Sequence, residues 1–195
     1  MPLRSEPLTF YRDETKKRAG RRRELLLWLL YTVIAVFIAV IFVRTFGLKV
    51  RTAGASMEPQ IMSGDSVFIN RLSYIISSVG KNDVIAFYPG GNTDVHPYIK
   101  RVVGMPGDTL QIENGILLIN GFPDVGQSAE EPLMNEGILS QPLILGDHEY
   151  FVLSDNKRSS EDSRSAAIGV VRSEYIIGKV WFVIGSDSGR TGFIR

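Results

Sequence analysis

The stretch TLQIENGILLINGF, residues 109–122, indicates most directly what kind of fold this chain has. Apolar and polar residues alternate on both sides of Asn114–Gly115, and an Asn-Gly pair between two such runs is the strongest short-range signal of a two-residue hairpin turn. A second pair, Asn120–Gly121, ends the second run. Because alternation with a period of two is typical of a half-buried strand, the stretch predicts two paired antiparallel strands.

Similar short runs occur on both sides of this hairpin. They are rich in β-branched and aromatic residues and are separated by turn residues: SVFIN, DVIAFYP, VHPYIKRVVG, EYFVLS and YIIGKVWFVI. We therefore expect a mainly β chain whose residues 47–185 form a compact antiparallel β domain, with a smaller inserted β subdomain at about residues 106–148. Residues 123–142 are expected to form a surface excursion, and residues 186–195 a mobile tail with little to pack against.

The run LLLWLLYTVIAVFIAVIFV, residues 25–43, contains no charged residue. As a helix it would extend for about 28 Å, which is close to the thickness of the hydrocarbon core of a bilayer. A core helix of a soluble protein would carry a polar stripe, which this run lacks. We therefore expect a transmembrane helix over residues 25–46. The alternative is a cleaved signal peptide, but this run is longer than the usual apolar segment of one.

Charge is distributed unevenly along the chain. Residues 1–24 contain eight basic and four acidic residues, whereas the whole chain has a net charge of +1. This basic segment is expected to be cytoplasmic, because an excess of Lys and Arg marks the cytoplasmic side of a span, and residues 47–185 are then extracytoplasmic. The slightly acidic remainder argues against binding of nucleic acid. With no cysteine and only the distant His96 and His148, we expect no metal and no cofactor.

Three segments of the expected β domain combine residues with unusual chemistry. In GASMEP, residues 54–59, small residues precede Ser56 and would allow a substrate backbone to approach closely, although a surface loop could have the same composition. In YIKRVVGMPGD, residues 98–108, alternation puts Lys100 on one face with apolar neighbours, and desolvation there would lower its pKa. A solvated strand lysine is the alternative. The third segment, LSDNKRSSEDSR, residues 153–164, fits either a polar loop or a site.

Together with the apolar run, these segments resemble the type I signal peptidases, which are membrane-anchored serine proteases. That family has a membrane segment followed by S-M-x-P-T-L-x-x-G-D, Y-x-K-R-V-x-G-x-P-G-D and G-D-N-R-x-x-S-x-D-S-R. The chain has all three patterns in this order, and the resemblance extends from the apolar run to about Gly178. The chain departs from the patterns at four positions: Gln60 and Ile61 replace Thr and Leu, Ser154 replaces Gly, and Lys157 replaces Arg.

The resemblance implies a role for each matching residue. Ser56 would be the nucleophile, Lys100 the general base, and Ser160 the serine that orients the lysine. Gly54 stands where many members have a Ser or Thr that binds the oxyanion, so the oxyanion hole would depend on backbone N–H groups, chiefly that of Ser56. Four residues would support the site: Asp155, Asp162, Arg164 and Arg101.

The resemblance also implies a substrate and a location. The chain would remove signal peptides from exported preproteins after Ala-x-Ala, at the outer face of a bacterial plasma membrane that its single N-terminal helix spans. Its partners would be signal peptides emerging from the export machinery and membrane lipid, and not nucleic acid. The peptide would lie as an added strand between residues 47–53 and 95–99. Shallow pockets for small side chains would be formed by Met57, Ile61, Tyr98 and Ile99.

Alternatives remain open from the sequence alone. A histidine-based serine hydrolase would use His96 or His148, but the chain has no G-x-S-x-G motif. A membrane-anchored β module that binds peptides without cleaving them is compatible with the departures from the family patterns. Residues 53–55, Ala-Gly-Ala, have the spacing of a substrate directly before Ser56. They could permit slow self-cleavage, or they could be small only to pack closely.

Overall fold

The structure is a computed structural model that describes residues 10–124, 132–186 and 190–194. It divides into two compact units, residues 1–44 and residues 45–195. Parts of the predicted basic segment, surface excursion and tail lie outside the described residues: 1–9, 125–131, 187–189 and 195.

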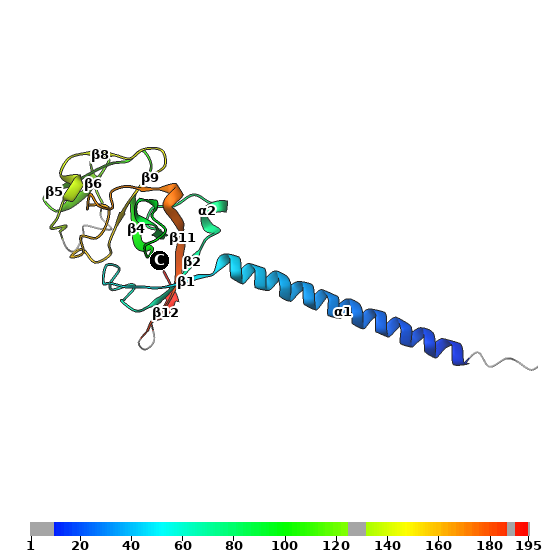
Figure 1. Ribbon diagram of the computed structural model, residues 1–195. Helices are drawn as coiled ribbons and strands as arrows, with labels where there is room; N and C mark the ends of the chain where they lie inside the picture. The colour runs from blue at the N-terminus through cyan, green and yellow to red at the C-terminus, as the bar shows by residue number, and fades with distance from the viewer. Residues whose placement is uncertain (1–9, 125–131, 187–189, 195) are drawn as a thin grey trace, which may run out of the picture. The chain divides into compact units, whose positions relative to one another are not determined.

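The described residues of the first unit all belong to one helix, α1, Phe10–Phe46 (Figure 1). Its segment Arg22–Val43 is long and apolar enough to cross a membrane, and its side chains are exposed. The helix begins at Phe10 and therefore includes basic residues that precede the apolar run. Arg and Lys are good helix formers, so charge does not end the helix where the apolar run begins. A long exposed apolar helix of this kind is compatible with a membrane anchor.

The second unit is built mainly of antiparallel strands, as the sequence predicts. Its larger sheet has the strand order β1-β2-β11-β3-β4-β9-β10, with β12 paired to β11, and every pairing described is antiparallel. The strands are β1 Leu48–Arg51, β2 Ser66–Asn70, β3 Val84–Phe87, β4 Tyr98–Gly104, β9 Glu149–Leu153, β10 Val171–Arg172, β11 Ile176–Ile184 and β12 Thr191–Phe193.

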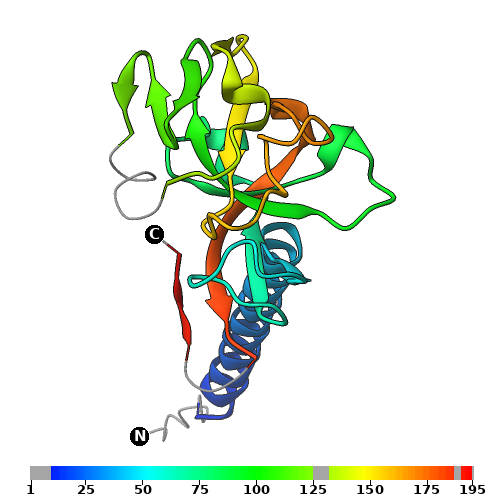
Figure 2. The same ribbon diagram turned by 90° about the vertical axis from the view of Figure 1, so that its left-hand side faces the viewer.

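The smaller sheet contains the hairpin that the sequence predicts. Figures 1 and 2 show it to one side of the larger sheet. Asn114 and Gly115 both have positive φ, +52° and +78°, as a two-residue hairpin turn of the primed type requires. The strand order is β7-β6-β5-β8. The strands are β5 Thr109–Glu113, β6 Ile116–Ile119, β7 Phe122–Pro123 and β8 Leu143–Ile144.

Helical segments within the second unit are short. Between residues 45 and 194, where described, one α-helix and three 3-10 turns connect the strands. None has the length of a helix that could form a layer over the sheet. They are α2 Ser73–Ile76, η1 Pro89–Gly91, η2 Gly137–Ser140 and η3 Ser173–Tyr175.

Buried side chains group on the two faces of β4 and on the smaller sheet. Tyr98 and Val102 belong to one hydrophobic cluster and Ile99 to another, as alternation along a strand requires. A third cluster joins the smaller sheet to β9. Leu133 and Leu139 are buried in this third cluster, so the described part of the predicted surface excursion does not lie entirely on the surface.

The tail also packs more than the sequence suggests. Thr191–Phe193 form β12 and pair with Phe182–Ile184 of β11, and the Phe193 ring lies edge-on to Phe182. Ile194 packs against a core cluster. The expectation that this segment has little to pack against is therefore wrong for residues 191–194. Its partners are distant in sequence, so the local pattern does not reveal them.

Candidate active site

The loop between β1 and β2, residues 52–65, carries Ser56 and is called here the Ser56 loop. Hydrogen bonds across its base close it: Thr52 N donates to Asp65 O at 2.8 Å, and Gly64 N donates to Thr52 O at 2.9 Å. The Thr52 hydroxyl donates to Met62 O at 2.7 Å. These bonds fix the two ends of the loop against one another, so Ser56 is held by a closed ring of chain.

Asp65 stabilises the same loop from inside. Its buried carboxylate accepts hydrogen bonds from Met62 N and Ser186 N, each at 2.9 Å. Burial acts to raise the pKa of Asp65, but these backbone hydrogen bonds, together with the charge of Arg190, bring it below its usual value. An ionised Asp65 thus joins the Ser56 loop to the chain after β11.

The backbone around Ser56 is positioned by Asn156. The Asn156 side-chain amide donates to Ala55 O at 3.0 Å, and the Asn156 backbone N–H donates to Ser56 O at 3.0 Å. Gly54 has a φ of +93°, a conformation that residues with a Cβ rarely adopt. In the described part of the chain the Ser56 N–H has no acceptor, which leaves it available to an incoming oxyanion.

Lys100 lies on β4, opposite Ile85 of β3, and is only 2% exposed. Burial lowers its pKa to about 8, because the charged ammonium loses its hydration. The nearby charges act mainly in the opposite sense: Asp162, Glu161 and Asp155 raise the pKa, and Arg164 lowers it. Desolvation is therefore the dominant effect, as the alternation of the strand predicts.

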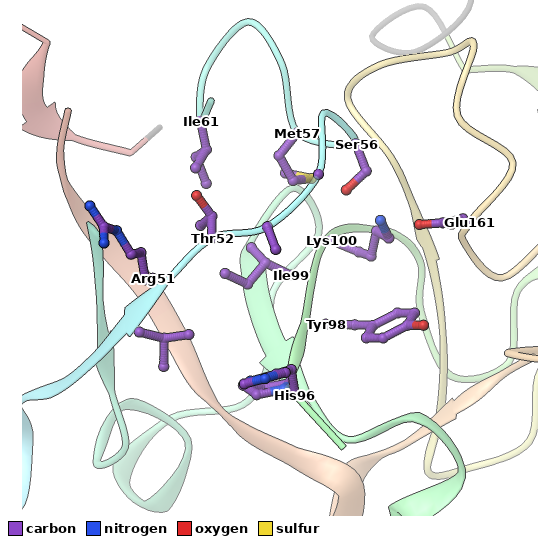
Figure 3. A pocket seen from close by; sticks show the side chains of 14 residues that line it. Arg51, Thr52, Ser56, Met57, Ile61, His96, Tyr98, Ile99, Lys100 and Glu161 are labelled. Carbon is purple, nitrogen blue, oxygen red and sulfur yellow. The ribbon is translucent and has the colours of Figure 1, made fainter. Parts of the chain in front are cut away.

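A cavity of about 260 Å³ brings Ser56 and Lys100 together. Its walls come from residues 50–54 on one side and residues 96–100 on the other. In Figure 3 the Ser56 hydroxyl and the Lys100 amine point toward the same space, whereas His96 lies at another part of the cavity. The remaining lining residues are Met57, Ile61 and Glu161.

Arg101 links three parts of the site. Its Nε and one terminal nitrogen donate to the two carboxylate oxygens of Asp155, each at 2.7 Å. The same terminal nitrogen also donates to Gln60 Oε1 at 2.5 Å. Gln60, which departs from the family pattern, thus contacts the guanidinium that holds Asp155. These hydrogen bonds of Arg101 connect β4 to the Ser56 loop and to the loop after β9.

A second ion pair lies inside the loop of residues 154–164. Arg164 donates to both carboxylate oxygens of Asp162, at 2.9 and 2.8 Å, and both side chains are buried. Arg164 also donates to the Ser159 and Asn135 carbonyl oxygens. Asp162 in turn accepts from the backbone N–H of Ser154 at 3.0 Å. This pair gives an otherwise irregular loop a fixed shape.

The cavity brings several of the predicted site residues together, but not Ser160. Besides Ser56 and Lys100, the cavity is lined by the predicted oxyanion and substrate residues Gly54, Met57, Ile61, Tyr98 and Ile99. Ser160 is exposed, does not line the cavity and, within the described residues, makes no hydrogen bond to Lys100. The structure therefore does not bring Ser160 to the lysine that it was expected to orient.

Sequence reasoning missed several contacts. Asn156 stands in the third pattern, but nothing local indicates that its amide reaches Ala55. Glu161 lines the cavity although sequence reasoning assigned it no role, whereas His96 lies within residues 95–99, which were expected to flank the substrate. Among the described residues no three His, Cys, Asp or Glu side chains group as a metal site would require.

Comparisons with known proteins agree on one family. The family model described as signal peptidase, peptidase S26, matches residues 25–184. Signal peptidase IB of Staphylococcus aureus is 29% identical over 181 residues, which cover 83% of this chain and 90% of that protein. Signal peptidase I of Bacillus amyloliquefaciens is 29% identical over 175 residues, covering 86% and 92%. A crystal structure of a signal peptidase I from Enterococcus faecalis has 29% sequence identity and a TM-score of 0.42, covering 53% of this chain and 97% of that one.

Proposed function

Because the chain belongs to the signal peptidase family, peptidase S26, we propose that it is a signal peptidase I that uses Ser56 as nucleophile and Lys100 as general base. Its similarity to signal peptidases I and IB supports the activity. The observation that carries the mechanism is the shared cavity, which is lined both by Ser56 and by a lysine whose pKa burial lowers to about 8.

The lowered pKa is what makes Lys100 a usable base. A lysine with an ordinary pKa is neutral in fewer than about one molecule in a thousand at pH 7. With a pKa of about 8, roughly a tenth of the molecules carry the neutral amine at that pH. A base whose pKa lies near the operating pH combines a useful neutral fraction with enough basicity to accept a proton from a hydroxyl.

The reaction then proceeds in two stages. Lys100 Nζ takes the proton of the Ser56 hydroxyl while Ser56 Oγ bonds to the scissile carbonyl carbon. The C–N bond breaks, the amine leaves with a proton from the Lys100 ammonium, and the acyl group stays on Ser56. The amine, neutral again, takes a proton from water as the water oxygen bonds to the acyl carbon. The bond from that carbon to Ser56 Oγ then breaks, and the Lys100 ammonium returns the proton to Oγ.

The oxyanion would be stabilised by backbone donors. The Ser56 N–H is available in the described structure, and the two Asn156 contacts hold the peptide unit to which it belongs and the peptide unit that follows. Gly54 provides no side-chain donor, so the geometry of these peptide units matters more here than in a site that also has a hydroxyl. Losing one such donor costs about 3 kcal/mol of transition-state stabilisation in other acyl-transfer enzymes.

The cavity walls support an extended peptide as substrate. Residues 50–54 continue from β1, which lies at the end of the strand order and pairs only with β2 among the described strands. A peptide added between them and residues 96–100 would gain main-chain hydrogen bonds, while alternate side chains entered the cavity. Met57, Ile61 and Ile99 are buried in its wall, and we propose that they bound shallow apolar pockets for Ala at the first and third positions before the cut.

The membrane helix would bring this site to its substrates. We place the N-terminus in the cytoplasm and the β domain outside the plasma membrane, because the basic residues precede the apolar segment. Signal peptides would meet the enzyme at the outer membrane surface as they emerge from the export machinery. Because the enzyme and the signal peptides would lie in the same membrane, their effective concentration toward one another would be raised without any additional contact between them.

One assay tests the proposal. The full chain in detergent micelles is given a fluorogenic peptide with Ala at the first and third positions before the cut. Wild type should cleave after the second Ala, and Ser56→Ala and Lys100→Ala should each lose at least about a thousandfold in kcat/KM. Changing His96 and His148 together to Ala should lower kcat/KM far less than either Ser56→Ala or Lys100→Ala, because neither histidine takes part in the chemical step, although His96 lines the cavity. No cleavage by folded wild type would favour a peptide-binding module over an enzyme.

A further inference from the structure

Glu161 brings a carboxylate to the catalytic cavity that the described part of the fold does not use. The residue belongs to the loop after β9, is exposed, and lines the cavity together with Ser56 and Lys100. Its backbone N–H donates to Ser159 Oγ at 3.4 Å, whereas its carboxylate makes no hydrogen bond and no ion pair to a described residue. This carboxylate is therefore available to a group on the substrate.

Glu161 lies at the end of the cavity where the chemistry would take place. In Figure 3 its side chain is on the far side of Lys100 from Ile99, and Arg51 lies at the opposite end. The two walls of the cavity extend between these ends, and Glu161 belongs to neither wall. The cavity thus has an arginine at one end and a glutamate beside the catalytic pair at the other.

The proposed function decides which part of a substrate meets Glu161. The scissile carbonyl has to lie at Ser56 Oγ, and the residues before the cut lie as an added strand between the two walls. The peptide after the cut continues from the scissile bond away from these walls. Of the described residues that line the cavity, Glu161 is the one from the loop after β9. The residues after the cut therefore leave the cavity toward its carboxylate.

We propose that Glu161 gives this enzyme a preference for basic residues directly after the cleavage site. The proposal rests on the proposed function, because it names a specificity-determining residue of the same site. Lys or Arg at the first two positions after the cut brings a cation beside the carboxylate, whereas Asp or Glu there is repelled. Position 161 is the variable one in S-x-D-S-R, so this charge is set by the chain and not by the family pattern.

Lys100 does not cancel the charge of Glu161 in the reactive enzyme. No ion pair joins Glu161 to Lys100, which is 2% exposed, whereas Glu161 is exposed. A lysine that acts as a base is neutral when it takes the proton of Ser56. In this form of the enzyme the carboxylate is not balanced by that amine, so it attracts a substrate cation most strongly when the base is ready to act.

The charge of Glu161 also acts on the base itself. Glu161 raises the pKa of Lys100, against the larger effect of burial, so Glu161→Gln should lower this pKa further. That change alters the rate for all substrates alike. A ratio of kcat/KM values for two peptides at one pH cancels the shared effect, so the ratio reports the proposed contact and the rate alone does not.

Three peptides test the proposal on the full chain in a nonionic detergent at low salt. Each contains the Ala-x-Ala site, and they differ only in the first two residues after the cut, which are Lys-Lys, Gln-Gln or Glu-Glu. Wild type should cleave the Lys-Lys peptide with a kcat/KM about threefold above that of the Gln-Gln peptide, and should cleave the Glu-Glu peptide most slowly.

Two substitutions at Glu161 and one matched control show whether this carboxylate is responsible. Glu161→Gln should bring the ratios of kcat/KM close to one, whereas Glu161→Asp keeps the charge and should retain most of the preference. Glu113→Gln removes an exposed carboxylate from β5, outside the cavity, and should keep the ratios of wild type. The preference of wild type should also shrink between about 0.02 M and about 1 M NaCl, because salt screens exposed charges.

Two kinetic results would overturn the proposal. One is an active wild type that cleaves the three peptides equally well, and the other is a Glu161→Gln enzyme with the ratios of wild type. Peptide binding to Ser56→Ala, measured by fluorescence anisotropy, separates the proposal from the function on which it rests. If wild type is inactive but the Lys-Lys peptide binds about threefold more tightly than Gln-Gln, and only while Glu161 is present, the function fails and the contact stands. An inactive wild type with equal binding of all three peptides contradicts both.

Discussion

Arg101 and Asp155 form a two-bond ion pair, in which Nε and a terminal nitrogen of the guanidinium each donate to one carboxylate oxygen at 2.7 Å. Both side chains are largely buried. Arg101 directly follows Lys100 on β4, and Asp155 directly follows Ser154 after β9. The pair therefore fastens the loop that follows β9 to the middle of β4, and Gln60 extends the connection to the Ser56 loop.

Replacing Asp155 should destabilise the fold and the site together. Asp155→Ala leaves a largely buried guanidinium without its carboxylate, for which we expect a loss of about 3 kcal/mol in the free energy of unfolding. Gln60→Thr, which restores the residue of the family pattern, removes one hydrogen bond and should cost about 1 kcal/mol. Denaturant unfolding of both variants checks this order. Equal stability of Asp155→Ala and wild type would show that the pair does not fasten the strands.

Lys100 should cost stability at neutral pH. Its pKa is about 8 in the fold and near 10.5 in the unfolded chain, so the unfolded state binds more protons between these values. The free energy of unfolding should therefore rise with pH across this window. Below pH 8, burial of the charged Lys100 should lower it by roughly 3 kcal/mol. Lys100→Met removes the charge and keeps most of the volume. It should be more stable than wild type at pH 7.

The difference between the Lys100→Met variant and wild type should shrink above pH 8 and largely vanish near pH 10.5. Chemical unfolding of both proteins at a series of pH values measures it. A constant difference at all pH values would mean that Lys100 is not desolvated in the folded chain.

Asn156 should act on the rate of the chemical step. Its amide holds the carbonyl of Ala55, next to the N–H that would bind the oxyanion. Asn156→Ala should lower kcat by about ten- to a hundredfold and change KM little, because only the transition state depends on this alignment. Asn156→Asp is the matched variant, since it keeps the size but replaces the donor by an acceptor. It should be at least as impaired, whereas an active Asn156→Asp enzyme would exclude a donor role.

The ion pair of Arg164 and Asp162 should contribute more to stability than an exposed pair of the same type. Arg164→Ala strands a buried carboxylate and should cost about 3–5 kcal/mol. Arg172→Ala removes an arginine that pairs with Glu174 where both side chains are exposed, and should cost less than about 1 kcal/mol. Thermal unfolding compares them. Similar losses for the two variants would contradict the structural role of the buried pair.

The orientation in the membrane is open to a direct labelling experiment. The chain has no cysteine, so a cysteine introduced by a single substitution is the only cysteine of the protein that a maleimide can label. In intact cells a membrane-impermeant maleimide should label Glu113→Cys in the β domain and should label Ser5→Cys in the N-terminal segment only after lysis. The reverse pattern would place the site on the cytoplasmic side and remove it from emerging signal peptides.

Local sequence patterns predicted the features of this protein that depend only on a few neighbouring residues. Asn114–Gly115 makes the expected hairpin because both residues adopt positive φ readily. The alternation around Lys100 left a desolvated and a solvated lysine open, and the structure buries the side chain beside the neighbours that share its face of the strand. The apolar run likewise predicted a long helix, although its start at Phe10 was not foreseen.

Contacts between distant segments could not be predicted in the same way. The opposition of Arg101 and Leu153 follows from the pairing of β4 with β9, and no local pattern encodes that register. The amide of Asn156 reaches a residue 101 positions away. Matching to a family pattern assigned the orienting role to Ser160, which lies exposed, because a pattern aligns residue types and not the path of the loop that carries them.

The most direct test of the account is the titration of one amine. In the full chain with ¹³C-labelled lysine, the NMR signal of Lys100 is identified by its loss in Lys100→Arg and is followed from pH 6 to pH 12. The account predicts a midpoint near pH 8, with Ser56→Ala titrating similarly. A midpoint near 10.5, the value of a solvated lysine, would mean that Lys100 is charged at neutral pH and cannot take the proton of Ser56.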